Sequence, residues 1–114
     1  MHFNDYQKQA ITTDLYDGTM KSVADHAFLE KAFGLVGEAG EVAEKLKKII
    51  RDEGGKLSDE AHAEVIKEFG DVLWYVSALS HYLGVSLDDV ANRNLEKVLS
   101  RKARGVTMGS GDNR

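Results

Sequence analysis

The sequence contains no cysteine and no proline. Without cysteine the chain can form neither a disulfide framework nor a thiolate metal site. The absence of proline, the strongest helix breaker, favours a mainly helical chain. No apolar run approaches the roughly 20 residues of a membrane-spanning helix, so we expect no membrane partner. The first residues, 1–5, lack the basic-then-apolar order of a signal peptide, and a cytoplasmic location is the default expectation.

An excess of positive charge is also missing. The 15 basic and 19 acidic side chains give a formal net charge of −4, which argues against nucleic acid as a partner. A small anionic ligand still fits this charge if a metal or local basic groups offset the acids. With 114 residues, 42% of them hydrophobic, the chain has the length and composition of one globular domain with a modest core.

Apolar spacing, serine caps and glycine stops predict four helices. They span approximately residues 3–16, 25–52, 59–83 and 87–104. The expected fold class is therefore all-α, a bundle of four or five helices joined by short connections. We expect one domain over residues 1–105. The small, polar tail of residues 106–114 is expected to be disordered.

Three glycines, Gly34, Gly37 and Gly40, interrupt the apolar stripe of the second helix at intervals of three. Each costs about 1 kcal/mol relative to alanine inside a helix, so a compensating interaction is expected. With this spacing they form a bare strip that lets a backbone or a ligand come close. The alternative is a break near Gly37 that divides the segment into two helices.

Two helices each carry a pair of carboxylates three residues apart: Glu38 with Glu41, and Glu68 with Asp71. Residues at i and i+3 share one helix face. Apolar residues flank the second pair closely, which predicts burial, and buried acids need partners. Four converging carboxylates repel one another unless they are protonated or bind cations. Oxygen ligands without cysteine favour Mg²⁺, or Mn²⁺ in its place, although a solvated acidic helix face is the alternative.

Histidine distinguishes this pattern from a redox metal site. Di-iron carboxylate bundles use Glu-x-x-His pairs on two of their helices. His26, His62 and His81 do not supply such pairs. All-oxygen ligation is therefore the better interpretation, and a carboxylate-bridged redox protein is disfavoured.

The last helix places Asn94, Lys97 and Arg101 on one face. Such cations suit a polyphosphate when a metal site lies nearby, although they also complement the negative end of the helix dipole. Tyr75 lies one turn after Asp71 on the same face. It is a candidate for packing over a sugar or base, or else a core aromatic with its hydroxyl at the rim.

Taken together, these motifs resemble the MazG-like nucleotide pyrophosphohydrolases of the all-α NTP pyrophosphatase superfamily, which includes dimeric dUTPases and dCTP pyrophosphatases. The family signature is E-x-x-E, a spacer, then E-x-x-D. Here it is filled within residues 34–45 and 68–76, followed by the basic face of the last helix. The resemblance covers roughly residues 3–105.

The resemblance implies Mg²⁺-dependent cleavage of a nucleoside triphosphate between the α- and β-phosphates, giving a monophosphate and pyrophosphate. It further implies a homo-oligomer, either a dimer or a tetramer, with sites near the subunit contacts. The implied catalytic residues and metal ligands are Glu38, Glu41, Glu68 and Asp71; the implied phosphate-binding residues are Lys97, Arg101 and Asn94; and Tyr75 would contact the sugar or base. The N-terminal third matches no member clearly enough to name the base. A non-catalytic helical regulator that binds nucleotide or protein is the alternative hypothesis.

Overall fold

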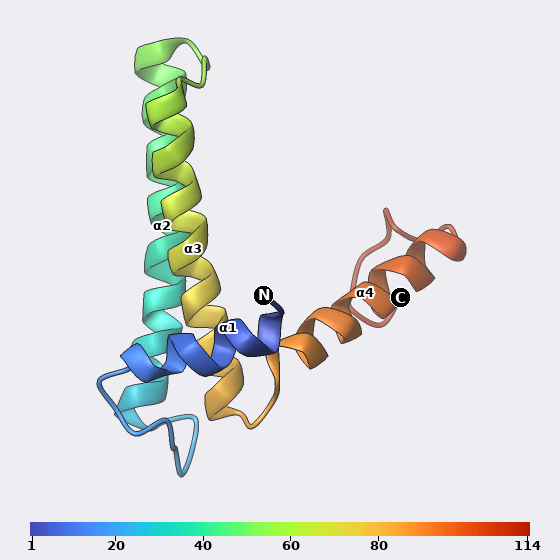
Figure 1. Ribbon diagram of the computed structural model, residues 1–114. Coiled ribbons are helices and arrows are strands. Elements are labelled where there is room, and N and C mark those ends of the chain that lie inside the picture. Colours follow the sequence, from blue (N-terminus) through green and yellow to red (C-terminus); the bar gives the residue numbers. More distant parts are fainter.

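The computed structural model describes residues 1–114, and it contains helices and no strands, which confirms the predicted all-α class (Figure 1). None of its helices is long and apolar enough to cross a membrane. The elements in chain order are α1 (Phe3–Ala10), the 3₁₀ helix η1 (Ile11–Thr13), α2 (His26–Glu53), α3 (Asp59–Tyr82) and α4 (Leu87–Ala103).

Helices α2 and α3 lie side by side as a long antiparallel hairpin (Figure 1). Residues in the connection between the two helices determine where α2 ends and where α3 begins. Gly54 ends α2 with a φ of 61°, a left-handed conformation that glycine adopts without a Cβ penalty. The Ser58 hydroxyl then accepts a hydrogen bond from the Ala61 backbone N–H at 3.1 Å and caps α3. Both signals were predicted from the sequence and are confirmed.

Helix α2 runs without interruption through its three glycines, so the alternative of a break near Gly37 is wrong. Gly34 has a specific packing role, because a Cβ at this position would overlap the ring of Tyr75. Gly37 and Gly40 face open space in the single chain. The Tyr75 ring therefore packs on the glycine strip at Gly34, whereas nothing in the same chain packs on it at Gly37 or Gly40.

Helix α1 crosses the base of the hairpin and is fixed there by the buried side chain of Gln7 (Figure 1). Its amide nitrogen donates to the carbonyl oxygens of Ser77 at 3.3 Å and Val85 at 3.1 Å, and its amide oxygen accepts from the Leu87 N–H at 3.0 Å. One side chain thus joins α1, α3 and the start of α4. Because backbone groups buried without partners are costly, this contact fixes the turn between α3 and α4.

The predicted first helix was too long, because α1 and η1 end at Thr13 rather than near residue 16. The chain leaves the helix at Asp14, whose carboxylate turns inward to Lys31 of α2. Their Oδ1 and Nζ atoms lie 2.8 Å apart, and the two side chains are 3% and 2% exposed. The Tyr82 hydroxyl donates to the other Asp14 oxygen at 2.5 Å. The Lys31 ammonium also lies over the rings of Tyr16 and Tyr82, at 4.7 and 5.0 Å from their centroids.

Helix α4 projects away from the hairpin and contacts α1 and α3 but not α2 (Figure 1). Its cap is as predicted, with the Ser86 hydroxyl accepting from the Asp89 N–H at 3.1 Å. The hydrophobic core of one chain is small: the buried apolar residues are Val65, Ala78, Tyr82 and Leu87. Phe69 is 50% exposed, because no other element of the same chain covers that side of α3.

Candidate metal and nucleotide site

Three carboxylates from the two long helices meet on one side of the hairpin. Glu38 of α2 and Glu68 and Asp71 of α3 each offer an oxygen, and these three oxygens lie within 4.8 Å of one another. The antiparallel pairing of α2 and α3 brings the two predicted pairs to the same level. Glu41, the fourth predicted ligand, is exposed on α2 and lies outside this group.

The acids of the cluster are less buried than the sequence predicted. Asp71 is exposed, and Glu38 and Glu68 are only partly buried. Trp74 and Tyr75 line a cavity together with Asp71, but they leave its side chain exposed. The cluster is therefore accessible to a ligand from solvent rather than enclosed in the core.

The electrostatics of the cluster are those of crowded acids. Burial, a hydrogen bond with Glu68 and the charges of Asp71, Glu68 and Glu41 raise the pKa of Glu38 above its ordinary value. A hydrogen bond from Lys45 lowers the pKa of Glu68, with smaller contributions from the lysine charge and from Glu38. Glu38 thus retains a proton more readily than Glu68, and a bound cation would relieve the part of this effect that comes from the neighbouring acids.

Lys45 is a site residue that the sequence analysis missed. Its ammonium lies 2.8 Å from Glu68 Oε1 and 3.2 Å from Glu64 Oε2. The sequence does place Lys45 two turns after Glu38 on the same face of α2, and this position was the one indication of its role. A lysine in a charged helix gives no local indication of which acid on another helix it meets, so the contact follows from the hairpin pairing.

Tyr75 lies beside the acids, as predicted. A cavity of about 370 Å³ is lined by Glu38, Asp71, Trp74 and Tyr75. A second cavity of about 200 Å³ is also lined by Trp74 and Tyr75, and it extends to the Asp14–Lys31 ion pair. The two cavities therefore lie next to each other and share an aromatic wall.

Trp74 lines both cavities. Its indole N–H donates to the Ala10 carbonyl at 3.2 Å and to the Thr13 hydroxyl at 2.9 Å. These bonds hold the ring against the end of α1 and η1. The first helical segment of the chain therefore positions one wall of the site.

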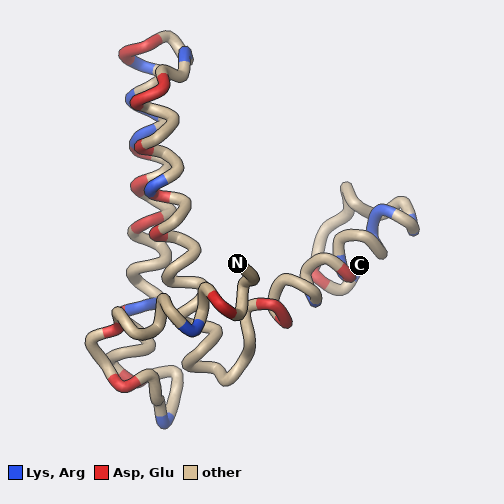
Figure 2. The backbone as a smooth tube through the Cα atoms, viewed as in Figure 1, with Lys and Arg blue, Asp and Glu red and all other residues tan.

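The predicted phosphate-binding residues do not reach the acids within one chain. Asn94 and Lys97 line a separate cavity of about 440 Å³ on α4. Arg101 is buried, and its guanidinium donates to the Asp112 carbonyl at 2.5 Å. Acidic and basic positions alternate along the α2–α3 hairpin, whereas the basic end of α4 lies far from it (Figure 2).

Comparison with known proteins agrees with this geometry. Residues 28–106 match the family model described as the MazG nucleotide pyrophosphohydrolase domain, and this range contains the carboxylate cluster. The Gene 37 protein of Mycobacterium phage L5 is 46% identical over 114 residues, which is 100% of both chains. No solved structure matches.

The family acts on nucleoside triphosphates and is typically dependent on a divalent metal, which the oxygen-only ligand cluster suits. The matched range covers more than half of the sequence. The chain belongs to the MazG nucleotide pyrophosphohydrolase family.

Proposed function

We propose that this protein hydrolyses nucleoside or deoxynucleoside triphosphates between the α- and β-phosphates, giving a nucleoside monophosphate and pyrophosphate. The observation that carries the proposal is the meeting of Glu38, Glu68 and Asp71 beside an aromatic-lined cavity. Acids so close together favour a cation, and a cation beside a cavity suits a phosphorylated ligand. The proposed setting is the cytoplasm, with free nucleotides rather than nucleic acid as substrates.

The donor set fits Mg²⁺, with Mn²⁺ as a substitute. Three carboxylates give hard oxygen ligands, and Mg²⁺ is usually bound by few carboxylates together with waters and substrate phosphates. We assign Glu38, Glu68 and Asp71 as ligands and Glu41, from the next turn of α2, as the fourth acid. Mg²⁺ in this position would neutralise phosphate charge and lower the pKa of a bound water.

The second, smaller cavity beside Trp74 and Tyr75 is the proposed place of the sugar or base. Tyr75 borders both cavities, so a nucleotide with its phosphates at the acids would bring its sugar or base against this ring. Stacking on an aromatic ring is worth about 1–3 kcal/mol per base. The ring itself is held against the bare backbone of Gly34.

The Gly34–Tyr75 contact gives a direct prediction. Gly34→Ala forces the Tyr75 ring to move and is expected to raise the KM for the nucleotide by about tenfold, within the range of one lost stacking contact. Gly37→Ala is the matched control, because its new methyl group meets open space. The control is expected to leave KM unchanged and to stabilise α2 by about 1 kcal/mol. Steady-state kinetics and thermal unfolding of both variants test this, and equal KM values would contradict it.

We also infer that the active form is a dimer or a tetramer. One chain exposes seven large apolar side chains on the α2–α3 hairpin: Leu29, Phe33, Val36, Leu46, Ile50, Ile66 and Phe69. Phe33 and Val36 lie roughly 140° and 160° around α2 from Glu38, on the side away from the acids. An apolar surface of this extent favours a protein partner, and a second copy is the proposed one.

The oligomer would also explain the position of α4. Asn94, Lys97 and Arg101 stay far from the acids of their own chain, and a second copy is the proposed route by which they reach a triphosphate. Arg101 would first have to release the Asp112 carbonyl that it now binds. The proposal therefore makes the site dependent on the subunit contact.

Phe33→Glu tests the subunit contact. Phe33 is 71% exposed in one chain, so the substitution should not disturb the monomer fold, but it places a charge in the proposed contact. We expect a shift from oligomer to monomer in light scattering and a loss of activity. Met108→Glu is the control, because Met108 is 97% exposed and lies outside the apolar set. A wild-type protein that is monomeric and fully active would contradict the inference.

The reaction is tested with a panel of ribo- and deoxynucleoside triphosphates, each with and without Mg²⁺. Chromatography must separate monophosphate plus pyrophosphate from diphosphate plus phosphate. The proposal predicts metal-dependent monophosphate from one or a few nucleotides. Tight nucleotide binding by a folded, Mg²⁺-loaded oligomer with no turnover of any nucleotide would favour a non-catalytic regulator instead.

A further inference from the structure

Lys45 is the residue whose position the proposed reaction does not yet explain. Lys45 forms an ion pair with the cluster through Glu68, and no other lysine or arginine does so with Glu38, Glu68 or Asp71. We propose that Lys45 is a resident counter-ion: it holds Glu68 in the absence of metal and moves to a nucleotide phosphate when metal and nucleotide bind together. This inference rests on the proposed function of the same site.

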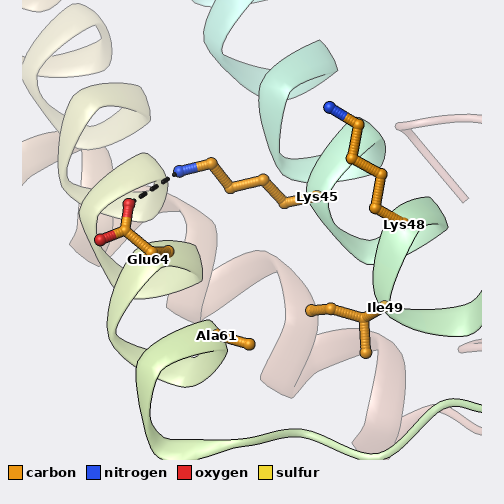
Figure 3. Close-up of a pocket in the computed structure, with 5 residues that line it drawn as sticks. All are labelled: Lys45, Lys48, Ile49, Ala61 and Glu64. Atoms are coloured by element: carbon orange, nitrogen blue, oxygen red, sulfur yellow. Dashed lines mark hydrogen bonds and ion pairs between the residues drawn. The ribbon is translucent and has the colours of Figure 1, made fainter. Parts of the chain in front are cut away.

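The geometry gives Lys45 two partners and room to move. Its ammonium lies 2.8 Å from Glu68 Oε1 and 3.2 Å from Glu64 Oε2, and the side chain is 28% exposed. Figure 3 shows Lys45 reaching from α2 to Glu64 on α3, at a cavity of about 280 Å³. Glu64 therefore keeps Lys45 near the site when Glu68 is engaged elsewhere.

The positive charge of Lys45 affects the binding of both the metal and the nucleotide. A positive charge beside a ligand carboxylate repels an incoming divalent ion, so metal alone binds more weakly than the acids would otherwise bind it. Lysine has three donors on a flexible stem and binds phosphate oxygens well. A metal-bound triphosphate offers Lys45 a new anionic partner as the metal engages Glu68.

The consequence is a coupling between the two ligands. A nucleotide that binds Lys45 removes its repulsion of the metal, so nucleotide raises the affinity for metal. By linkage, metal then raises the affinity for nucleotide by the same factor. The site would thus bind the metal–nucleotide complex in preference to either component alone.

Lys67 provides a matched control for this role. Its ammonium pairs with Glu64 at 2.7 Å, like Lys45, but it does not contact Glu68. Lys67→Met therefore removes a lysine charge and a Glu64 contact without changing the cluster. Glu64→Gln is a second test, because it removes the alternative partner and leaves Lys45 with Glu68.

The experiment measures Mn²⁺ affinity by calorimetry, first without nucleotide. Lys45→Met is expected to bind Mn²⁺ about tenfold more tightly than the wild type, and Glu64→Gln more weakly. Lys67→Met is expected to stay within about twofold of the wild type. The α,β-methylene analogue of the cleaved nucleotide is then added, and it should tighten Mn²⁺ binding in the wild type but much less in Lys45→Met.

The outcomes separate this inference from the proposed function. Unchanged or weaker Mn²⁺ binding by Lys45→Met would overturn the counter-ion role, even if the wild type hydrolyses nucleotides. Equal coupling by the analogue in wild type and Lys45→Met would also overturn it. A wild type that neither binds Mn²⁺ nor cleaves any nucleotide would instead refute the proposed function.

Discussion

Asp71→Asn is expected to lower kcat/KM by at least about a thousandfold while the fold remains intact. Asparagine keeps the shape of the side chain but loses the negative charge that a hard divalent ion requires. Metal stabilisation of phosphate charge is worth several kcal/mol, and each 1.36 kcal/mol is about tenfold in rate. Asp71 is exposed on α3, so the substitution leaves the core unchanged.

Glu44→Gln is the control for this loss. Glu44 lies on α2 and pairs with Lys47 at 3.1 Å, outside the carboxylate cluster. Its removal changes the net charge by the same amount and should leave kcat/KM within about twofold. Circular dichroism and thermal unfolding establish that both variants fold. Full activity in Asp71→Asn would contradict the assignment of the metal ligands.

Asp14→Asn is expected to lower the free energy of unfolding by about 3–5 kcal/mol, because it leaves the Lys31 ammonium buried without a counter-charge. The total stability of a domain is typically only 5–15 kcal/mol, so the loss is large. Urea unfolding at pH 7 measures it. Asp52→Asn is the control, because Asp52 and its partner Arg51 are exposed, and no measurable change is expected. A similarly small effect at Asp14 would contradict the structural role of the buried pair.

The Asp14–Lys31 ion pair also predicts how the stability of the fold changes with pH. Burial raises the pKa of Asp14, but hydrogen bonds from Lys31, Tyr82 and the Tyr16 backbone N–H, together with the Lys31 charge, hold the pKa below its ordinary value. A lowered carboxyl pKa contributes stability above the unfolded-state value of about 3.9, and this contribution is lost as the pH falls through the folded value. Wild-type stability should therefore fall below about pH 4, with a shallower fall in Asp14→Asn.

The parts of the fold that follow from local rules were predictable. Ser58, Gly54 and Ser86 act through neighbouring backbone groups, so caps and stops were visible in the sequence. The carboxylate pairs were visible too, because i, i+3 spacing fixes their face. Which three of the four acids meet depends on how α2 and α3 are aligned, and no local pattern gives that alignment.

The remaining features depend on contacts between distant residues. The side chains of Gln7 and Asn4 accept hydrogen bonds from backbone N–H groups in the first turn of α4, about 80 positions away, and these bonds fix the start of α4. The Asn4 side chain accepts from the Asp88 N–H at 3.0 Å. The Asp14–Lys31 pair was missed because charged residues in a helical pattern normally face solvent.

An anomalous difference map from crystals grown with Mn²⁺ and a non-hydrolysable nucleotide tests whether Glu38, Glu68 and Asp71 hold the catalytic metal, as proposed. We expect a strong peak within coordination distance of all three carboxylates and no such peak in crystals of Asp71→Asn. A peak elsewhere, or none near these residues in a protein that cleaves nucleotides with Mn²⁺, would contradict this proposal.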